Sequence, residues 1–248
     1  MVCAAKGYPL VVTMPDSASI ERRKLMRFLG AKVLLTPAEE GGTGAYNKAK
    51  KLVIKNNWFF AKQFENEDNS NIHEKTTGEE IFNDFKNIGL DYWVSGYGTG
   101  GTFTGVSRVL REKMPQTKLI LTEPDVAQLV GSNQKQIEMM MDLPLNLIQI
   151  GIHTPYRDGP DFIPLVLQES IDNKYFDELI PVSGNDGIFG LMNWHKRRNN
   201  NWSFRRSTFA IAIEIAKKLK KVRKYYACFQ ILLKDTCLVF YLTVLIQK

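Results

Sequence analysis

The run Gly98-Thr99-Gly100-Gly101-Thr102 has the residue types and spacing that suit binding of a phosphate group. Glycines let successive backbone N–H groups approach an anion, and the hydroxyls of Thr99 and Thr102 can add donors. The run follows the apolar segment 92–95 and precedes a helical pattern at 103–113. The N-terminal dipole of such a helix favours negative charge. We therefore predict a strand, a phosphate-binding loop and a helix in this order.

The loop differs from the two commonest phosphate-binding motifs. It does not end in Gly-Lys-Ser/Thr, as a P-loop does. Nor does it match Gly-x-Gly-x-x-Gly at the first strand with an acidic residue about 20 positions later. The alternative is an ordinary tight turn between a strand and a helix, but three glycines and two threonines within five residues favour the phosphate site.

Two other polar segments are candidates for binding or catalysis. Gln63-Phe64-Glu65-Asn66 directly follows the apolar segment 58–61, at the edge where ligand sites of α/β proteins form; the alternative is a plain loop. His73 stands in a polar run before an expected helix, where bonding the backbone or capping the helix is favoured over catalysis. No nucleophile–base pair is evident. With three scattered histidines and no Cys-x-x-Cys, we expect no metal site.

Composition and charge indicate a soluble globular protein. The 248 residues are 44% hydrophobic and 24% charged, enough for one large or two small domains. Three scattered cysteines and the lack of a secretory signal favour the cytoplasm. Of the net charge of +7, the segment Lys196–Lys224 carries +10 (eleven Lys or Arg against Glu214), which leaves −3 elsewhere. A solvated face or a disturbed sequence explains this segment better than a nucleic-acid partner does.

Strand and helix patterns alternate along the chain, which predicts an α/β fold with parallel sheets covered on both faces. The expected strands are 8–13, 32–36, 58–61, 92–95, 118–122 and 178–182. The expected helices begin at Ser19, Ala45, Thr76, Phe103 and Leu165. Segment 130–160 has no clear period, and the pattern degrades from about residue 189. The apolar stretch Tyr225–Ile246 is long enough for a membrane span, but Lys234 and Asp235 at its middle argue against one.

The sequence resembles cysteine synthase (O-acetylserine sulfhydrylase), of the fold type II group of pyridoxal-phosphate enzymes. The similarity is nearly continuous over residues 1–130 and 160–187. The matching words are Ala4-Ala5-Lys6-Gly7-Tyr8, Thr13-Met14-Pro15, Glu21-Arg22-Arg23, Gly30-Ala31, Gln63-Phe64-Glu65-Asn66, His73, Thr76-Thr77-Gly78-Glu79, the segment 94–102, Glu123-Pro124 and Asp161-Phe162-Ile163-Pro164.

This resemblance implies a fold, a cofactor, a reaction and partners. The fold would be two parallel-sheet domains of the tryptophan synthase β-like architecture. Residues 1–61 would be the remainder of the small N-terminal domain, and 62–248 the large cofactor domain, degraded after about 188. Gly98–Thr102 would bind the phosphate of pyridoxal 5′-phosphate, and Gln63 would lie near the substrate carboxylate. Acetate would be eliminated from O-acetylserine and sulfide added to give L-cysteine; a homodimer and a complex with serine acetyltransferase are also implied.

The first departure from the family lies before the matching words. The family's Schiff-base lysine, in a Ser-x-Lys-Asp-type motif, precedes the word at residues 4–8, as does the Thr-Ser-Gly-Asn-Thr-type loop that holds the substrate carboxylate. Lys6 is not that lysine, because it matches a position within the word itself. We therefore expect that this polypeptide has no catalytic residue of its own and is inactive, with exposed sheet edges and low stability.

The second departure is the segment 196–206, where the family has Lys-Glu-Gly, an apolar run and Gly-Val-Ser-Gly-Gly or a close variant. One codon choice for these residues, read one base later, encodes Lys-Glu-Gly-Ile-Ile-Ile-Gly-Val-Ser-Gly-Gly. We interpret the segment as a local frameshift in the gene or gene model. Two alternatives stay open: a non-catalytic binding or regulatory protein of the same fold, and a relative of cystathionine β-synthase or cyanoalanine synthase.

Overall fold

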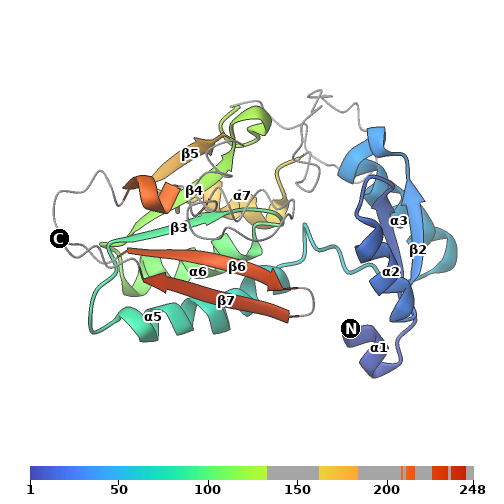
Figure 1. Ribbon diagram of the computed structural model, residues 1–248, viewed down its shortest axis with the longest axis horizontal. Coiled ribbons are helices and arrows are strands. Elements are labelled where there is room, and N and C mark those ends of the chain that lie inside the picture. The colour runs from blue at the N-terminus through green and yellow to red at the C-terminus, as the bar shows by residue number, and fades with distance from the viewer. Residues whose placement is uncertain (133–161, 184–207, 209–210, 216–224, 234–235, 244–248) are drawn as a thin grey trace. The chain divides into compact units, whose positions relative to one another are not determined.

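The computed structural model describes residues 1–132, 162–183, 208 and 211–215, and the backbone of the strands at 225–233 and 236–243 (Figure 1). The chain separates into two compact units. Met1–Lys62 form the main part of the first, and the second begins at Gln63. The sequence hypotheses for residues 133–161 and 184–207, including the frameshifted segment, lie outside the described residues.

The first unit is a two-stranded parallel sheet with helices. Strand β1 (Val11–Pro15) pairs in parallel with β2 (Lys32–Thr36). The remaining elements are α1 (Val2–Lys6), α2 (Ile20–Phe28), the short 3₁₀ helix η1 (Ala38–Glu40) and α3 (Gly41–Asn56). Ser19 caps α2 by accepting a hydrogen bond from the backbone N–H of Arg22 at 3.4 Å, as expected from its side chain.

Two polar contacts attach α3 to this sheet. The hydroxyl of Thr13 donates to the carbonyl of Ala45 (2.8 Å), and Nζ of Lys48 donates to the carbonyl of Leu35 (2.7 Å). The helix begins at Gly41, four residues before the predicted start, so the glycines expected in a loop form its first turn. Thr43, Gly44 and Ala45 are buried there, because small residues allow this turn to pack closely.

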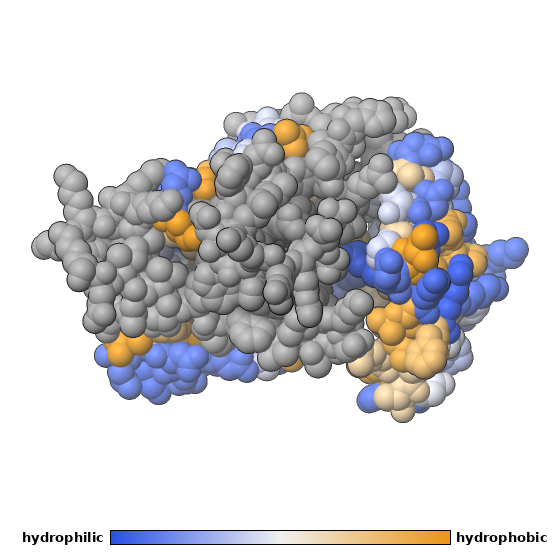
Figure 2. Space-filling view, in the orientation of Figure 1, coloured by the Kyte–Doolittle hydropathy of each residue, from blue (hydrophilic) through white to orange (hydrophobic). Residues whose placement is uncertain are grey.

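The strand predicted at 58–61 is wrong, since these residues have no regular secondary structure. The apolar residues that suggested a buried strand are exposed to solvent: 43% of Trp58 and 90% of Phe59 are exposed. Apolar surface is also visible elsewhere on the first unit (Figure 2), where Val2, Tyr8 and Phe28 are exposed.

The second unit contains a five-stranded sheet of order β5-β4-β3-β6-β7. Its strands are β3 (Tyr92–Gly96), β4 (Lys118–Pro124), β5 (Glu178–Val182), β6 (Tyr225–Leu233) and β7 (Thr236–Thr243). All neighbouring pairs are parallel except β6 and β7, which are antiparallel. Residues 225–233 and 236–243 are thus two strands, which agrees with the argument from Lys234 and Asp235 against a membrane-spanning helix. No helix within the described ranges is long and apolar enough to cross a membrane.

Two helical regions of the second unit begin earlier than predicted, whereas the helix predicted at Leu165 begins at that residue. They are α4 (Asp68–His73), the π-helical turn η2 (Glu74–Gly78), α5 (Glu79–Phe85), α6 (Gly101–Lys113), the 3₁₀ helix η3 (Asp125–Ala127) and α7 (Leu165–Asp172). Helical structure therefore starts at Asp68 and not at Thr76. Thr76 is inside it, and its hydroxyl donates to the carbonyl of Ile72 (2.6 Å).

The side chains of β3 and β4 alternate between two apolar clusters, as expected for strands covered on both faces. Trp93 and Leu121 face one cluster, which includes Phe103 of α6 and Leu167 of α7. Val94 faces the other cluster, with Ile120, Val182, Ile211 and Ala212. Trp93 and Phe103 are 1% and 0% exposed, and their ring centroids lie 5.1 Å apart. This contact packs α6 directly against the strand that precedes it.

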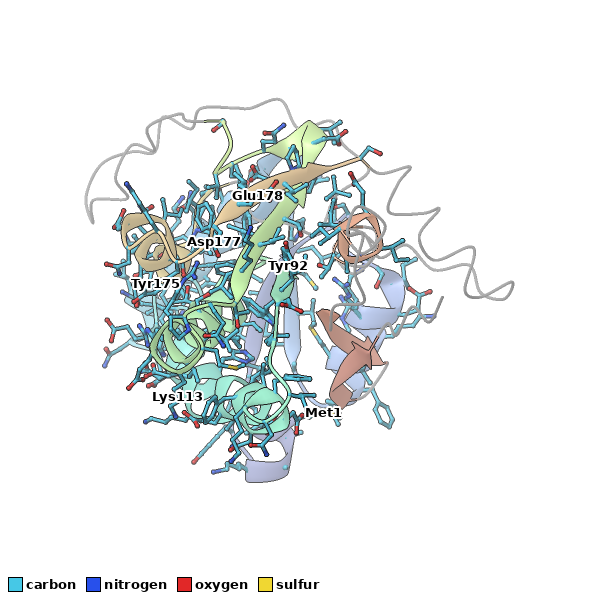
Figure 3. All side chains as sticks on the ribbon, turned by 90° about the vertical axis from the view of Figure 1, so that its left-hand side faces the viewer. Met1, Tyr92, Lys113, Tyr175, Asp177 and Glu178 are labelled. Atoms are coloured by element: carbon cyan, nitrogen blue, oxygen red, sulfur yellow. The ribbon has the colours of Figure 1, made fainter. Side chains whose placement is uncertain are left out.

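Polar contacts hold the far end of α6 to the chain before β5. Arg111 donates from Nε to the carbonyl of Tyr175 (2.9 Å) and from Nη2 to Oδ2 of Asp177 (2.8 Å). The same carboxylate oxygen accepts from the backbone N–H of Leu119 at 2.7 Å. Tyr175, Asp177 and Glu178 lie along the entry to β5 in Figure 3. The helix that starts at the glycine loop is thereby fixed at both ends.

Candidate functional site

The glycine run connects β3 to α6, as predicted. Gly100 is the residue before the first turn of α6 and has φ +89°, which residues with a side chain rarely adopt. A Cβ on Gly100 would also lie 2.6 Å from Cβ of Leu167. Gly98 differs, since a Cβ there would meet no atom of the residues that the structure describes within 4 Å. The loop is thus closed on the α7 side and open at Gly98.

Backbone donors are available on this loop. Within the described part of the chain, the N–H groups of Gly98, Thr99 and Gly100 donate to no protein acceptor. The first contact of the helix is the N–H of Thr104 to the carbonyl of Gly100 (2.9 Å). Free N–H groups at the start of a 13-residue helix attract an anion. The open position at Gly98 leaves room for one.

Asn69 of α4 links the loop to the segment before α4. Its Nδ2 donates to Oγ1 of Thr99 and to the carbonyl of Gln63, both at 2.8 Å. The structure thus brings Gln63 and Thr99, two of the predicted site residues, to the same amide group. The side chain of Gln63 itself is exposed.

His73 holds the other threonine of the loop. Its Nε2 lies 3.1 Å from Oγ1 of Thr102, and its Nδ1 lies 2.9 Å from Oγ1 of Thr77. The π-helical turn that follows His73 carries Thr77, and such turns are frequent at functional sites. We predicted that His73 bonds the backbone or caps a helix. This prediction is wrong, because both ring nitrogens contact threonine hydroxyls. Burial lowers the pKa of His73.

The lowered pKa of His73 gives a pH dependence of stability. Below pH about 6.5 the unfolded chain binds a proton at this residue more readily than the folded chain does. The free energy of unfolding is therefore at its full value above this pH, where the ring is neutral in both states, and it decreases as the pH falls. We expect the free energy of unfolding in urea to fall more between pH 7.5 and 5.5 for the wild type than for His73→Gln. Equal slopes would contradict this expectation.

A buried carboxylate supports the residue before the loop. Glu123, 1% exposed, accepts a hydrogen bond from the hydroxyl of Tyr97 (2.7 Å) and three from the backbone N–H groups of 129–131, at 2.8 to 3.1 Å. Burial, and the charge of Glu123 next to it, raise the pKa of the Tyr97 phenol. Glu123 therefore ties the end of β3 to the chain after β4.

Sequence reasoning missed Asn69 and the pairing of Tyr97 with Glu123. Asn69 lies in a polar stretch without helical periodicity, so nothing in its spacing distinguished it. Glu123 had a usable signal, because an acidic residue directly after the apolar run 118–122 would be buried by its position. No group of His, Cys, Asp or Glu side chains in the described residues is arranged to hold a metal ion.

Comparison with known proteins defines the family. The family model described as pyridoxal-phosphate-dependent enzyme matches residues 1–188. The chain belongs to this family. The resemblance inferred from the matching words is confirmed, as is the α/β fold with parallel sheets.

Individual members of the family are similar to this chain in sequence or structure over part of their length. A cysteine synthase of Staphylococcus aureus is 37% identical over 185 residues, which are 75% of this chain and 53% of that protein. The chain thus spans about half the length of this relative. The crystal structure of O-ureido-L-serine synthase has a TM-score of 0.73 at 32% identity, over 88% of this chain and 64% of that one. Cysteine synthase of Entamoeba histolytica has a TM-score of 0.68 at 27% identity, over 87% and 59%.

Proposed function

We propose that Gly98–Thr102 bind the phosphate group of pyridoxal phosphate in an enzyme of β-replacement chemistry. The observation that carries the proposal is the open position at Gly98 beside three backbone N–H groups that donate to no acceptor among the described residues. A Cβ at Gly98 would occupy this space, so the residues present fit the phosphate. As part of the same proposal, 1–61 belong to the small domain and 62–248 to the large cofactor domain.

The chain's residues would bind and orient, while the bound cofactor supplies an electron sink for bond cleavage next to the amino-acid α-carbon. The backbone of the loop and the start of α6 would neutralise phosphate charge. Thr99 would add a hydroxyl donor, and His73 would fix the position of Thr102. Gln63 would lie near the carboxylate of the amino-acid substrate, since its turn is joined to the loop through Asn69.

The substrates that we favour are O-acetylserine and sulfide, with L-cysteine as product. The 37% identity to the Staphylococcus aureus cysteine synthase supports this choice. A homodimer, a complex with serine acetyltransferase and a cytoplasmic location belong to the same proposal. Among the 248 residues, however, no lysine matches the family's Schiff-base motif. For this polypeptide by itself we therefore propose binding of the cofactor phosphate without turnover, as a non-catalytic protein would show.

Titration of the 248-residue polypeptide tests both parts of the proposal. Pyridoxal phosphate is expected to bind at least about tenfold more tightly than pyridoxal, because charged hydrogen bonds to phosphate contribute about 1.5 kcal/mol or more. No visible absorbance band from a covalent bond between a lysine and the cofactor is expected. Equal affinities for the two compounds would contradict the phosphate site. A stoichiometric covalent band would contradict the lack of turnover.

A further inference from the structure

Asn69 uses both hydrogens of its side-chain amide within the site. One is donated to Oγ1 of Thr99 and the other to the carbonyl of Gln63, each at 2.8 Å. The two acceptors are 36 positions apart in the sequence. No other side chain in the described residues joins the Gln63 turn to the glycine loop by hydrogen bonds to both. Among these residues, the amide of Asn69 is thus the direct side-chain link between the loop and this turn.

The contact with Asn69 also decides how the Thr99 hydroxyl can act. Its oxygen accepts from Nδ2 of Asn69 and, at 3.5 Å, faces the backbone N–H of Gly101. With its oxygen accepting, the hydroxyl keeps its own hydrogen for a further partner. No acceptor for this hydrogen is found among the described residues. The hydroxyl is thus held as a donor at the edge of the open loop.

The backbone around Asn69 leaves its side chain little freedom. A Cβ on Gly101 would collide with Oδ1 and Cγ of Asn69, so the amide lies directly against the loop backbone. The backbone of Asn69 is also held in place, because its N–H donates to the carbonyl of Asn66 (3.1 Å). Glycine at 101 is therefore required by the position of Asn69.

We propose that Asn69 is a positioning residue that fixes the Thr99 hydroxyl as a donor to the cofactor phosphate and holds it in register with the Gln63 turn. This inference rests on the proposed function of the loop. Asn69 does not touch the phosphate itself. Its effect passes through Thr99, and this separates it from a residue that merely stabilises α4.

The test uses Asn69→Asp, which keeps the shape of the side chain but cannot donate when ionised, and Asn69→Ala as a second variant. Each is expected to lower the affinity for pyridoxal phosphate at least about fivefold. The affinity for pyridoxal is expected to stay unchanged. Affinities are measured by fluorescence titration at a temperature below the unfolding transition of every variant, so that lowered stability does not enter the result.

Asn71→Asp is the matched control. Asn71 lies on the same helix, and its Oδ1 accepts from Nη1 of Arg108 (2.9 Å), an interaction that aspartate can keep. The variant introduces the same charge two residues away without touching the glycine loop. Its affinity for pyridoxal phosphate is expected to match that of the wild type. An equal loss in Asn71→Asp and Asn69→Asp would show a general effect of charge and overturn the proposal.

A double-mutant cycle with Thr99→Val separates positioning from stability. If Asn69 acts through the Thr99 hydroxyl, Asn69→Ala is expected to cause little further loss of affinity once Thr99 is valine. Additive losses would overturn the proposal. A wild-type polypeptide that does not prefer pyridoxal phosphate over pyridoxal would instead refute the proposed function. The two failures are thus distinguishable.

Discussion

Gly98→Val is expected to lower the affinity for pyridoxal phosphate by at least about 30-fold, which corresponds to about 2 kcal/mol. The valine side chain would occupy the open position in front of the loop and exclude the phosphate from the N–H groups. The fold should be unaffected, because Gly98 does not have a positive φ and no atom of the described residues lies within 4 Å of its Cβ position. Isothermal titration and thermal unfolding of the same sample measure both effects.

Gly98→Ala is the graded control for this experiment. A methyl group fills less of the space, so its loss of affinity should lie between wild type and Gly98→Val. A valine variant that binds pyridoxal phosphate as tightly as wild type would place the phosphate elsewhere. A large fall in melting temperature for either variant would contradict the open space seen at this position.

Gly105→Ala is expected to destabilise the fold by about 3 kcal/mol, the upper range for overpacking. The added Cβ would collide with the backbone carbonyl oxygen of Ser70 and lie 2.7 Å from the backbone nitrogen of Glu74. Both are main-chain atoms, so α6 and α4 must separate. Helix propensity alone predicts the opposite sign, since alanine is favoured over glycine in a helix by about 1 kcal/mol. Urea unfolding gives the difference directly.

Ser107→Ala is the control on the same helix. Ser107 is fully buried, and its hydroxyl has no hydrogen-bond partner in the described structure. Its removal should change stability by less than about 1 kcal/mol, because no hydrogen bond is lost. Similar unfolding free energies for Gly105→Ala and wild type would show that α4 and α6 are not in close contact. In that case the placement of His73 over Thr102 would also lose its support.

Several strands, including the one before the glycine loop, were predictable because apolar runs with clear ends determined them. Residues 32–36 and 178–182 form strands with the predicted bounds, and β3 extends the prediction by one residue. The loop at 98–102 was predictable because it lies between an apolar run and a helical pattern and because Gly100, with φ +89°, has a local backbone reason to be glycine. In these cases the physical cause lies within a few residues of its effect.

The errors arose where distant contacts decide the structure. The polar stretch from Asp68 has no apolar period, yet it is helical and packs so closely on α6 that a Cβ on Gly105 would collide with it. Trp58 and Phe59 have the composition of a buried strand but are exposed near the end of the first unit's main segment, Met1–Lys62. The contact from Asn69 to Thr99 spans 30 residues, and no local pattern indicates such a pairing.

The most direct test of the phosphate site is an NMR titration of the ¹⁵N-labelled polypeptide with pyridoxal phosphate. The backbone N–H signals of Gly98, Thr99 and Gly100 are expected to shift most, with the signal of Gly101 at the start of α6 next. Pyridoxal without the phosphate should leave these signals in place. If pyridoxal phosphate binds and shifts other residues while these N–H signals do not move, the glycine loop is not the phosphate site.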